Sequence, residues 1–145
     1  MYRTADRGSP FYEAFAATQL SRVLVVEDDA EFRRLIAATL RRDGFHVVEA
    51  TNGRELVEHV ARAVQAGDPP FDLIVSDIRM PRMTGLEAVA GLRAADWSTP
   101  VVLITAFGDA EAEAEATRLG AVLLAKPFDL CDLRTVVMQL AHASI

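Results

Sequence analysis

The segment Phe71-Asp72-Leu73-Ile74-Val75-Ser76-Asp77-Ile78-Arg79-Met80-Pro81 decides how this chain is organised. It opens with a short apolar run of the kind that forms a fully buried parallel strand. Asp77 follows, and Pro81 then prevents the strand from continuing because proline has no backbone N–H to donate. We therefore expect Asp77 where a buried strand meets a loop. Ligands bind at this carboxyl-terminal edge in open α/β sheets, although a strand-end aspartate also commonly caps a turn.

The rest of the chain repeats a strand followed by a helix, five times in all. The expected strands are Val23–Val26, His46–Glu49, the run that ends at Ser76 or Asp77, Pro100–Thr105 and Ala121–Ala125. Such alternation favours right-handed crossovers and a parallel sheet covered on both faces. The sequence therefore predicts an α/β fold with a five-stranded, doubly wound, flavodoxin-like sheet in the strand order 2-1-3-4-5.

The helices are predicted from apolar residues that recur every three to four positions. These residues are Phe32, Leu35, Ile36 and Leu40 in the first helix, Leu56, Val57, Val60, Ala61 and Val64 in the second, and Leu130, Leu133, Val137 and Leu140 in the last. Thr84 and Glu87 have the spacing of a capping box that starts the third helix, and Asp109 caps the fourth. Cys131 lies in the last helix, where we expect a small packed residue.

Composition limits the function classes. The 145 residues suffice for one domain that buries about two thirds of its unfolded surface. With 15 basic and 21 acidic residues the net charge is −6, which argues against direct binding of nucleic acid, because such domains are usually strongly basic. No apolar run approaches the ~20 residues of a membrane span. One cysteine cannot form an internal disulfide, so we expect a reducing, cytoplasmic location.

Residues 1–20 form an N-terminal extension that precedes the domain at 21–145. The first ten residues are polar and rich in turn formers, whereas Phe11, Tyr12, Phe15 and Ala16 recur at helical spacing. This pattern is typical of a short helix over Phe11–Gln19. Two interpretations stay open: a mobile extension, or a helix that docks on the body of the domain or on a second copy, the latter giving a homodimer.

Polar groups follow four of the expected strands. Glu27 and Asp28 come after the first strand, Asp77 ends the third, Thr105 ends the fourth, and Lys126 ends the fifth. In a parallel sheet these groups emerge at one edge. Clustered carboxylates repel one another unless a cation joins them, and Mg²⁺ is a hard ion that prefers oxygen ligands. An opposing hydroxyl and ammonium are what a phosphoryl group would need.

The combination of motifs resembles the receiver domains of two-component response regulators, over about residues 21–142. The matching motifs are Val-Val-Glu27-Asp28-Asp29, Asp77-Ile-Arg-Met80-Pro81 with Gly85 beyond, Thr105-Ala106 and Lys126-Pro127-Phe128. Each motif alone is weak, because acids at a helix start or a lysine before proline are usually surface features. Their joint occurrence at four strand ends makes the resemblance specific.

The resemblance implies a phosphoacceptor that signals through protein contacts. Asp77 would accept a phosphoryl group from the phosphohistidine of a sensor histidine kinase or a phosphotransfer protein. Lys126 would pair with the phosphoryl oxygens, and Thr105 would donate its hydroxyl to them and move inward. The Lys126-Pro127 bond would be cis, as in the family. The change would pass to a downstream protein or to an effector domain beyond the given chain.

The resemblance also implies a Mg²⁺ site. Asp28 would coordinate the ion directly, with Glu27 nearby through water. Asp77 would be a further ligand, and the backbone carbonyl of Arg79 a third protein ligand.

One position departs from the family pattern. Three residues before Lys126 the family usually carries Tyr or Phe, and this chain carries Leu123. Leucine has no flat ring to swing inward when the threonine moves. We therefore expect the signal to pass through backbone movement from Thr105 to Gly108.

Other function classes remain as alternatives. An unphosphorylated receiver-like scaffold or dimerisation module would not need the acids together with Thr105 and Lys126. A hydrolase of the haloacid-dehalogenase type uses a second aspartate two residues after its nucleophile, where this chain has Arg79. A flavodoxin-like cofactor binder would meet repulsion between phosphate and the acids at 27–29. A receiver is not a turnover enzyme, because it catalyses only its own phosphorylation and dephosphorylation.

Overall fold

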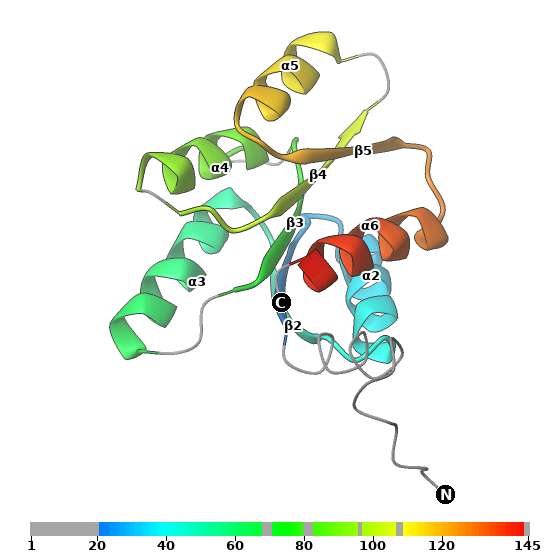
Figure 1. Cartoon of the computed structure of the whole chain (residues 1–145), viewed down its shortest axis with the longest axis horizontal. Coiled ribbons are helices and arrows are strands. Elements are labelled where there is room, and N and C mark those ends of the chain that lie inside the picture. The colour runs from blue at the N-terminus through cyan, green and yellow to red at the C-terminus, as the bar shows by residue number, and fades with distance from the viewer. Residues whose placement is uncertain (1–20, 68–70, 80–82, 96, 107–108, 144–145) are drawn as a thin grey trace, which may run out of the picture.

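The computed structural model describes residues 21–67, 71–79, 83–95, 97–106 and 109–143, so the extension at 1–20 lies outside the described residues. Within them, one parallel sheet alternates with five helices along the chain (Figure 1). In chain order the elements are β1 (Arg22–Val26), α2 (Ala30–Arg42), β2 (His46–Ala50), α3 (Gly53–Ala66), β3 (Leu73–Asp77), α4 (Gly85–Ala94), β4 (Val101–Ala106), α5 (Ala110–Arg118), β5 (Val122–Lys126) and α6 (Leu130–Ala143). The strand order β2-β1-β3-β4-β5 confirms the predicted flavodoxin-like fold.

The register of the strands brings their carboxyl ends to one edge. Val26 of β1 pairs with Ser76 of β3, so the next residue of each chain segment, Glu27 and Asp77, reaches the same edge. On the other side of β3, Asp77 pairs with Ile104 of β4. The apolar, β-branched strands explain this central position, because both of their faces are buried. The fifth strand is different: β5 is an edge strand and only half-buried.

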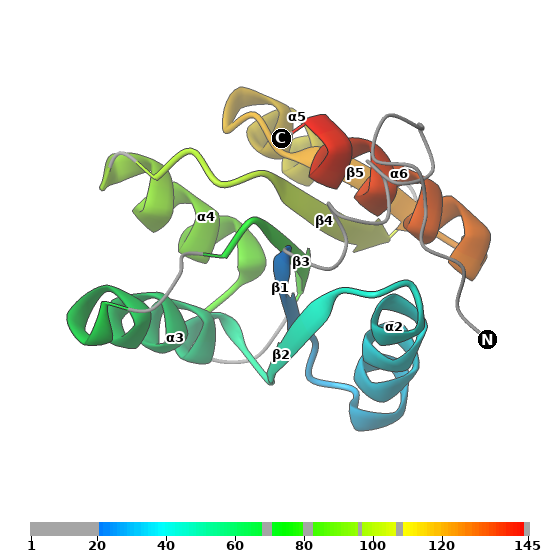
Figure 2. The ribbon, with the colours of Figure 1, turned by 60° about the horizontal axis from the view of Figure 1, so that its bottom comes forward.

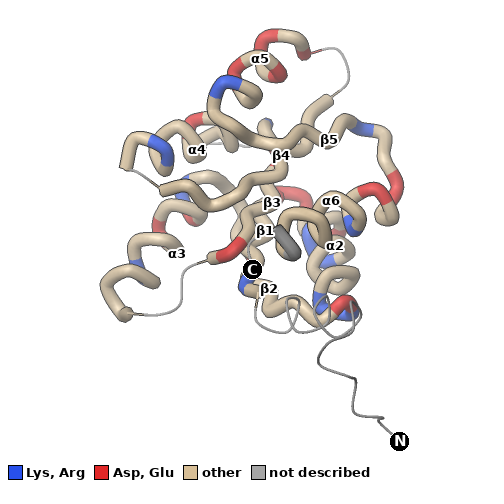
Figure 3. The backbone as a smooth tube through the Cα atoms, viewed as in Figure 1, with Lys and Arg blue, Asp and Glu red and all other residues tan. Residues whose placement is uncertain are grey.

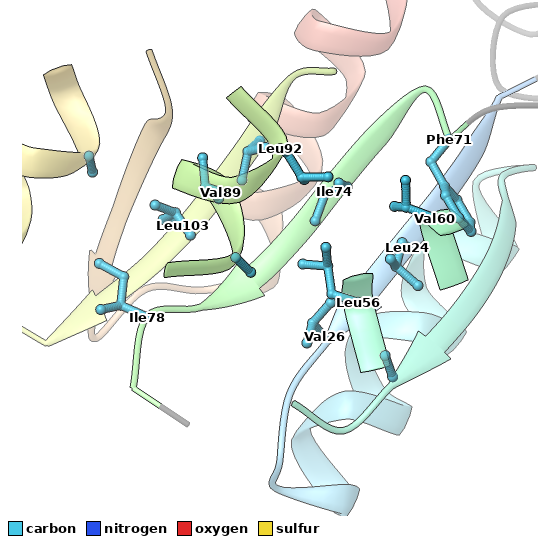
Figure 4. Close-up of a cluster of buried hydrophobic side chains, with 14 of the residues drawn as sticks. Leu24, Val26, Leu56, Val60, Phe71, Ile74, Ile78, Val89, Leu92 and Leu103 are labelled. Atoms are coloured by element: carbon cyan, nitrogen blue, oxygen red, sulfur yellow. The ribbon is translucent and has the colours of Figure 1, made fainter. Parts of the chain in front are cut away.

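The helices cover the sheet in two layers (Figure 2). On one face, α2 and α6 pack against alternate residues of β1, β3 and β4; this cluster includes Val23, Val25, Ile36, Leu40, Leu73, Val75, Leu133 and Val137. On the other face, α3, α4 and α5 pack against the remaining residues of the strands; this cluster includes Leu24, Val26, Leu56, Val60, Ile74, Val89, Leu92 and Leu103 (Figure 4). The period of two along each strand therefore divides the core into two halves.

Helix capping places the helices that flank the site. The Asp29 side chain accepts a hydrogen bond from the Phe32 N–H at 3.2 Å and starts α2. The predicted capping box of Thr84 and Glu87 is confirmed at the start of α4. Asp109 caps α5 through the Ala112 N–H, also as predicted. Three helices thus begin directly after loops at the carboxyl edge of the sheet.

The prediction of a core position is wrong for several residues. Leu35 is 50% exposed, Val57 38% and Val64 58%. In α2 and α3 the buried line runs through Ile36, Ala37 and Leu40 and through Leu56, Val60 and Ala63. The three exposed residues lie on the flank of that line, outside the stripe that packs against the sheet. Cys131 is also exposed, not packed, because it lies on the outer side of α6.

Many of the charged residues lie on the helices, and acidic residues recur along α5 (Figure 3). Glu111 and Glu113 lie in the first turn of α5, where carboxylates are favoured by the helix dipole. Among the helices that the structure describes, none has both the length and the apolar character that a bilayer span demands.

Candidate functional site

Three carboxylates meet at the carboxyl edge of the sheet. Glu27 and Asp28 follow β1, Asp77 ends β3, and one oxygen from each lies within 4.8 Å of the others. Glu27 and Asp77 are buried, whereas Asp28 is exposed to solvent. An oxygen set that combines buried ligands with one open side fits a hard cation that keeps part of its water shell. The cluster is therefore able to hold a metal ion.

The electrostatics of the cluster favour a bound cation. Burial raises the pKa of the Glu27 carboxyl from 4.5 to about 7, and a side-chain hydrogen bond with Asp28 and the charge of Asp77 add to the effect. The backbone N–H of Asp29 and the ammonium of Lys126 oppose it. Without a cation, Glu27 therefore holds a proton over much of the range below neutral pH.

Asp77 is held by donors on both carboxylate oxygens. Its Oδ2 lies 3.2 Å from the Nζ of Lys126, and its Oδ1 accepts the backbone N–H of Arg79 at 3.0 Å. The Lys126 ammonium also lies 5.4 Å from the ring centroid of Phe32. The carboxylate is thus fixed in orientation while remaining beside the acidic cluster.

Lys126 has an unusual place in the composition. It is the single lysine of the chain, and the other 14 basic residues are arginines. A compact ammonium acts as a point charge, whereas arginine presents a planar fork. The only lysine lies beside the only carboxylate that ends the central strand. The composition of the sequence therefore carries a second signal for Lys126, in addition to its place at a strand end.

Thr105 lies on β4, one residue beyond the partner of Asp77 in the strand pairing. It is buried, and its hydroxyl donates to the Ala106 carbonyl at 3.2 Å. The structure therefore places the hydroxyl in the same part of the sheet, engaged with backbone and not with the Asp77 carboxylate. Leu123 lies on β5 opposite Leu103 and packs partly buried against the core.

The Lys126–Pro127 peptide bond is cis, in agreement with the family pattern.

Two features of the site were not predicted. The Arg79 side chain forms an ion pair with Asp109 at 2.7 Å, which joins the loop after β3 to the start of α5. Gly85 approaches β3 closely: a Cβ there would lie 2.4 Å from the Asp77 carbonyl oxygen. Sequence spacing carries no signal for the ion pair, because its partners are 30 positions apart.

The family model for the response regulator receiver domain matches residues 23–138. The chain belongs to this family. The acidic pocket of Glu27, Asp28 and Asp77 lies within the matched residues and is consistent with a phosphoacceptor receiver in two-component signalling. Receiver domains are signalling modules and not turnover enzymes.

Relatives of different length share this receiver. The chain is 36% identical to the regulatory protein AtoC of Escherichia coli over 123 residues, which cover 84% of the chain and 25% of AtoC. It is 29% identical to sporulation initiation phosphotransferase F of Bacillus subtilis over 119 residues, 81% of the chain and 91% of that protein. The chain therefore spans about a quarter of AtoC but almost all of the Bacillus protein.

Solved structures agree with the fold. The receiver domain of the Francisella response regulator 1452 has a TM-score of 0.75 at 26% identity, over 86% of this chain and 99% of that one. Chemotaxis response regulator CheY4 of Vibrio cholerae has a TM-score of 0.70 at 32% identity, over 83% and 98%.

Proposed function

We propose that Asp77 accepts a phosphoryl group from a phosphohistidine of a sensor histidine kinase or phosphotransfer protein. The observation that carries this proposal is the setting of the Asp77 carboxylate, which has Lys126 at 3.2 Å on one oxygen and two further carboxylates within 4.8 Å. A structural aspartate at a strand end would need neither neighbour. Phosphoryl transfer depends mainly on positioning and charge neutralisation, and the contact between Asp77 and Lys126 supports both roles.

In the proposed reaction an oxygen of Asp77 attacks the phosphorus atom. The bond from phosphorus to the histidine nitrogen breaks, and the imidazole keeps the electron pair and takes up a proton. The Lys126 ammonium, which now donates to Asp77, turns to the oxygens of the arriving phosphoryl group. The Thr105 hydroxyl leaves the Ala106 carbonyl and donates to the same oxygens. These two donors stabilise the negative charge that the transfer brings into the site.

The metal in this proposal is Mg²⁺. Glu27, Asp28 and Asp77 would hold it with their carboxylates, together with the backbone carbonyl of Arg79. When bound, the ion neutralises the phosphoryl oxygens and the carboxylate cluster. The pKa of Glu27 is raised mainly by burial and further by Asp28 and the charge of Asp77, so a cation bound beside this carboxyl would stabilise its charged form, which supports this assignment.

The output of the receiver would be a protein contact. The larger relatives carry names such as transcriptional regulatory protein ZraR, whereas the Bacillus relative of similar size is named a phosphotransferase. Phosphorylated Asp77 would therefore act on a downstream protein, on a further domain of the same protein, or on the next member of a phosphorelay. We place this exchange in the cytoplasm, since Cys131 is an exposed free thiol.

Phosphorylation is tested by incubation with acetyl phosphate and Mg²⁺, followed by intact mass. The wild type should gain the mass of one phosphoryl group, and the isosteric Asp77→Asn variant should gain none. Asp132→Asn is the matched control, because Asp132 lies on α6, outside the acidic cluster. Equal labelling of wild type and Asp77→Asn would move the acceptor elsewhere. No labelling of any variant would favour the unphosphorylated scaffold.

A further inference from the structure

Arg33 is an arginine of α2 whose side chain is largely enclosed by the domain, with 13% of its surface exposed. Its Nε donates to the carboxylate of Glu49 on β2 at 3.2 Å, and its Nη1 donates to the backbone carbonyl of Glu27 at 2.9 Å. The guanidinium therefore joins an edge strand of the sheet to the first residue of the acidic cluster.

The place of Arg33 in the helix explains this reach. Helix α2 begins at Ala30, so Arg33 lies at the end of the first turn. Side chains on a helix tilt toward its N-terminus, and the guanidinium thus extends back to a carbonyl that lies six positions earlier in the chain. Arg34, one position later, is exposed to solvent instead.

The acidic loop, residues 27–29, needs anchors because its carboxylates repel one another. The Glu27 N–H donates to the Ala50 carbonyl of β2 at 3.0 Å, and the Asp29 carbonyl accepts the Arg33 N–H at 2.9 Å. Arg33 therefore holds the acidic loop both through its own backbone and through its guanidinium. These contacts fix the backbone from which the carboxylates of Glu27 and Asp28 extend.

Stability alone is a poor explanation for an ion pair at this position. Enclosing a charged group costs free energy, and the replacement of an enclosed ion pair by apolar side chains of similar volume is often neutral or stabilising. Glu49 offsets the charge of Arg33 and also pairs with Arg41 at 3.2 Å. The contact that apolar side chains could not replace is the hydrogen bond to the Glu27 carbonyl.

We propose that Arg33 is a positioning residue for the cation site. It holds the Glu27 carbonyl so that the carboxylates of Glu27 and Asp28 are set for a divalent cation, and Glu49 keeps the guanidinium in this orientation. The inference rests on the cation site of the proposed function. Loss of a group that orients metal ligands typically lowers metal affinity by roughly 10–100-fold. Because Arg33 acts on the backbone of a ligand, we expect a loss of about 10-fold.

The test is a titration of the full, metal-free chain with Mg²⁺, followed through the amide NMR signals of residues 27, 28 and 77. Arg33→Met removes the donors and keeps much of the volume, so it should weaken binding about 10-fold. Arg33→Lys keeps the charge but lacks the planar fork that joins two acceptors, so it should recover only part of the affinity. Arg34→Met is the matched control and should bind Mg²⁺ as the wild type does.

A second set of measurements separates positioning from a role in stability. In the metal-free chain the carbonyl ¹³C signal of Glu27 should shift in Arg33→Met, which loses the hydrogen bond to this carbonyl, and stay in place in Arg34→Met. The double variant Arg33→Met/Glu49→Met replaces the ion pair by apolar side chains, so its Tm should stay close to that of the wild type. Its Mg²⁺ affinity should nevertheless be as low as that of Arg33→Met.

The outcomes distinguish this inference from the proposed function. Equal Mg²⁺ affinity in the wild type and Arg33→Met would overturn the positioning role and leave the cation site in place. An equal loss of affinity in Arg33→Met and Arg34→Met, or wild-type affinity in the double variant, would overturn it as well. A wild type that binds no Mg²⁺ would overturn both the positioning role and the cation site.

Discussion

The guanidinium of Arg79 lies 2.7 Å from the carboxylate of Asp109, and through this contact the loop after the central strand holds the first turn of α5. The backbone N–H of the same arginine binds the Asp77 carboxylate at 3.0 Å. One residue therefore touches both the candidate phosphoacceptor and the cap of a helix. This link bypasses Leu123, which lacks the aromatic ring usual in the family.

We predict that the Arg79–Asp109 ion pair carries part of the signal. Beryllofluoride, a phosphoryl mimic, should change the amide NMR spectrum over residues 105–123 in the wild type. Arg79→Ala should reduce these changes in α5, because the loop no longer holds Asp109. The free energy of unfolding should change little, since the pair is exposed and screened by solvent.

Arg118→Ala is the matched control, because Arg118 forms an exposed ion pair with Glu115 inside α5 and no contact with the loop is described for it. Its spectral response should equal that of the wild type. An identical response in Arg79→Ala would show that the ion pair has no part in the signal.

Stability in the absence of metal should fall as the pH rises. The pKa of Glu27 is about 7 in the folded protein, whereas its ordinary value, which applies to the unfolded chain, is 4.5. Between these two pH values the folded state therefore binds more protons than the unfolded state. The free energy of unfolding then decreases from about pH 4.5 to pH 7 and above. Thermal unfolding in a chelator should give a lower Tm at pH 8 than at pH 5.5. This difference in Tm should be larger in the wild type than in Glu27→Gln, which measures the contribution of the other groups.

Magnesium should reverse this trend. A cation competes with the proton for the carboxylates, so Mg²⁺ should raise the Tm more at pH 8 than at pH 5.5. In Glu27→Gln the added stabilisation should be smaller, whereas the exposed Glu58→Gln should behave as wild type. The same Mg²⁺ effect at both pH values would contradict the assignment of Glu27 to the cation site.

Lys126 should be required for transfer more than for folding. Lys126→Gln removes the ammonium beside Asp77, and the loss of one stabilising charge typically slows the chemical step on the order of 100-fold. Lys126→Arg keeps the charge but changes its shape, so it should recover only part of the rate. Initial rates of phosphorylation by acetyl phosphate give the comparison, and a rate for Lys126→Gln equal to wild type would remove the residue from the mechanism.

Two glycines of α4 should respond oppositely to alanine. A Cβ at Gly85 would lie 2.4 Å from the backbone oxygen of Asp77, which cannot move without disturbing β3. We expect Gly85→Ala to cost about 1–3 kcal/mol of unfolding free energy. Gly91 is exposed, and a Cβ there would meet no atom from outside the local helix backbone within 4 Å, so Gly91→Ala should stabilise by about 0.5–1 kcal/mol. Urea unfolding of both variants should give changes in the free energy of unfolding that have opposite signs.

Local sequence patterns determined the fold and the edge of the sheet at which the site lies. The apolar runs specified the strands, and the capping residues Thr84 and Asp109 specified where two of the helices start. These properties depend on neighbours a few residues away, so they can be derived from the sequence. The parallel alternation then placed Asp77 and the acids at 27 and 28 together, because strands of one direction share their carboxyl edge.

Only the tertiary structure decided which side chains face inward and which distant groups meet. Leu35, Val57 and Val64 follow helical spacing yet are exposed, because the width of each buried line depends on how the helix lies on the sheet. The Arg79–Asp109 pair and the close approach of Gly85 depend on two loops folding over the same edge. Such contacts join segments far apart in the chain, and their geometry is set by packing, for which sequence periodicity carries no information.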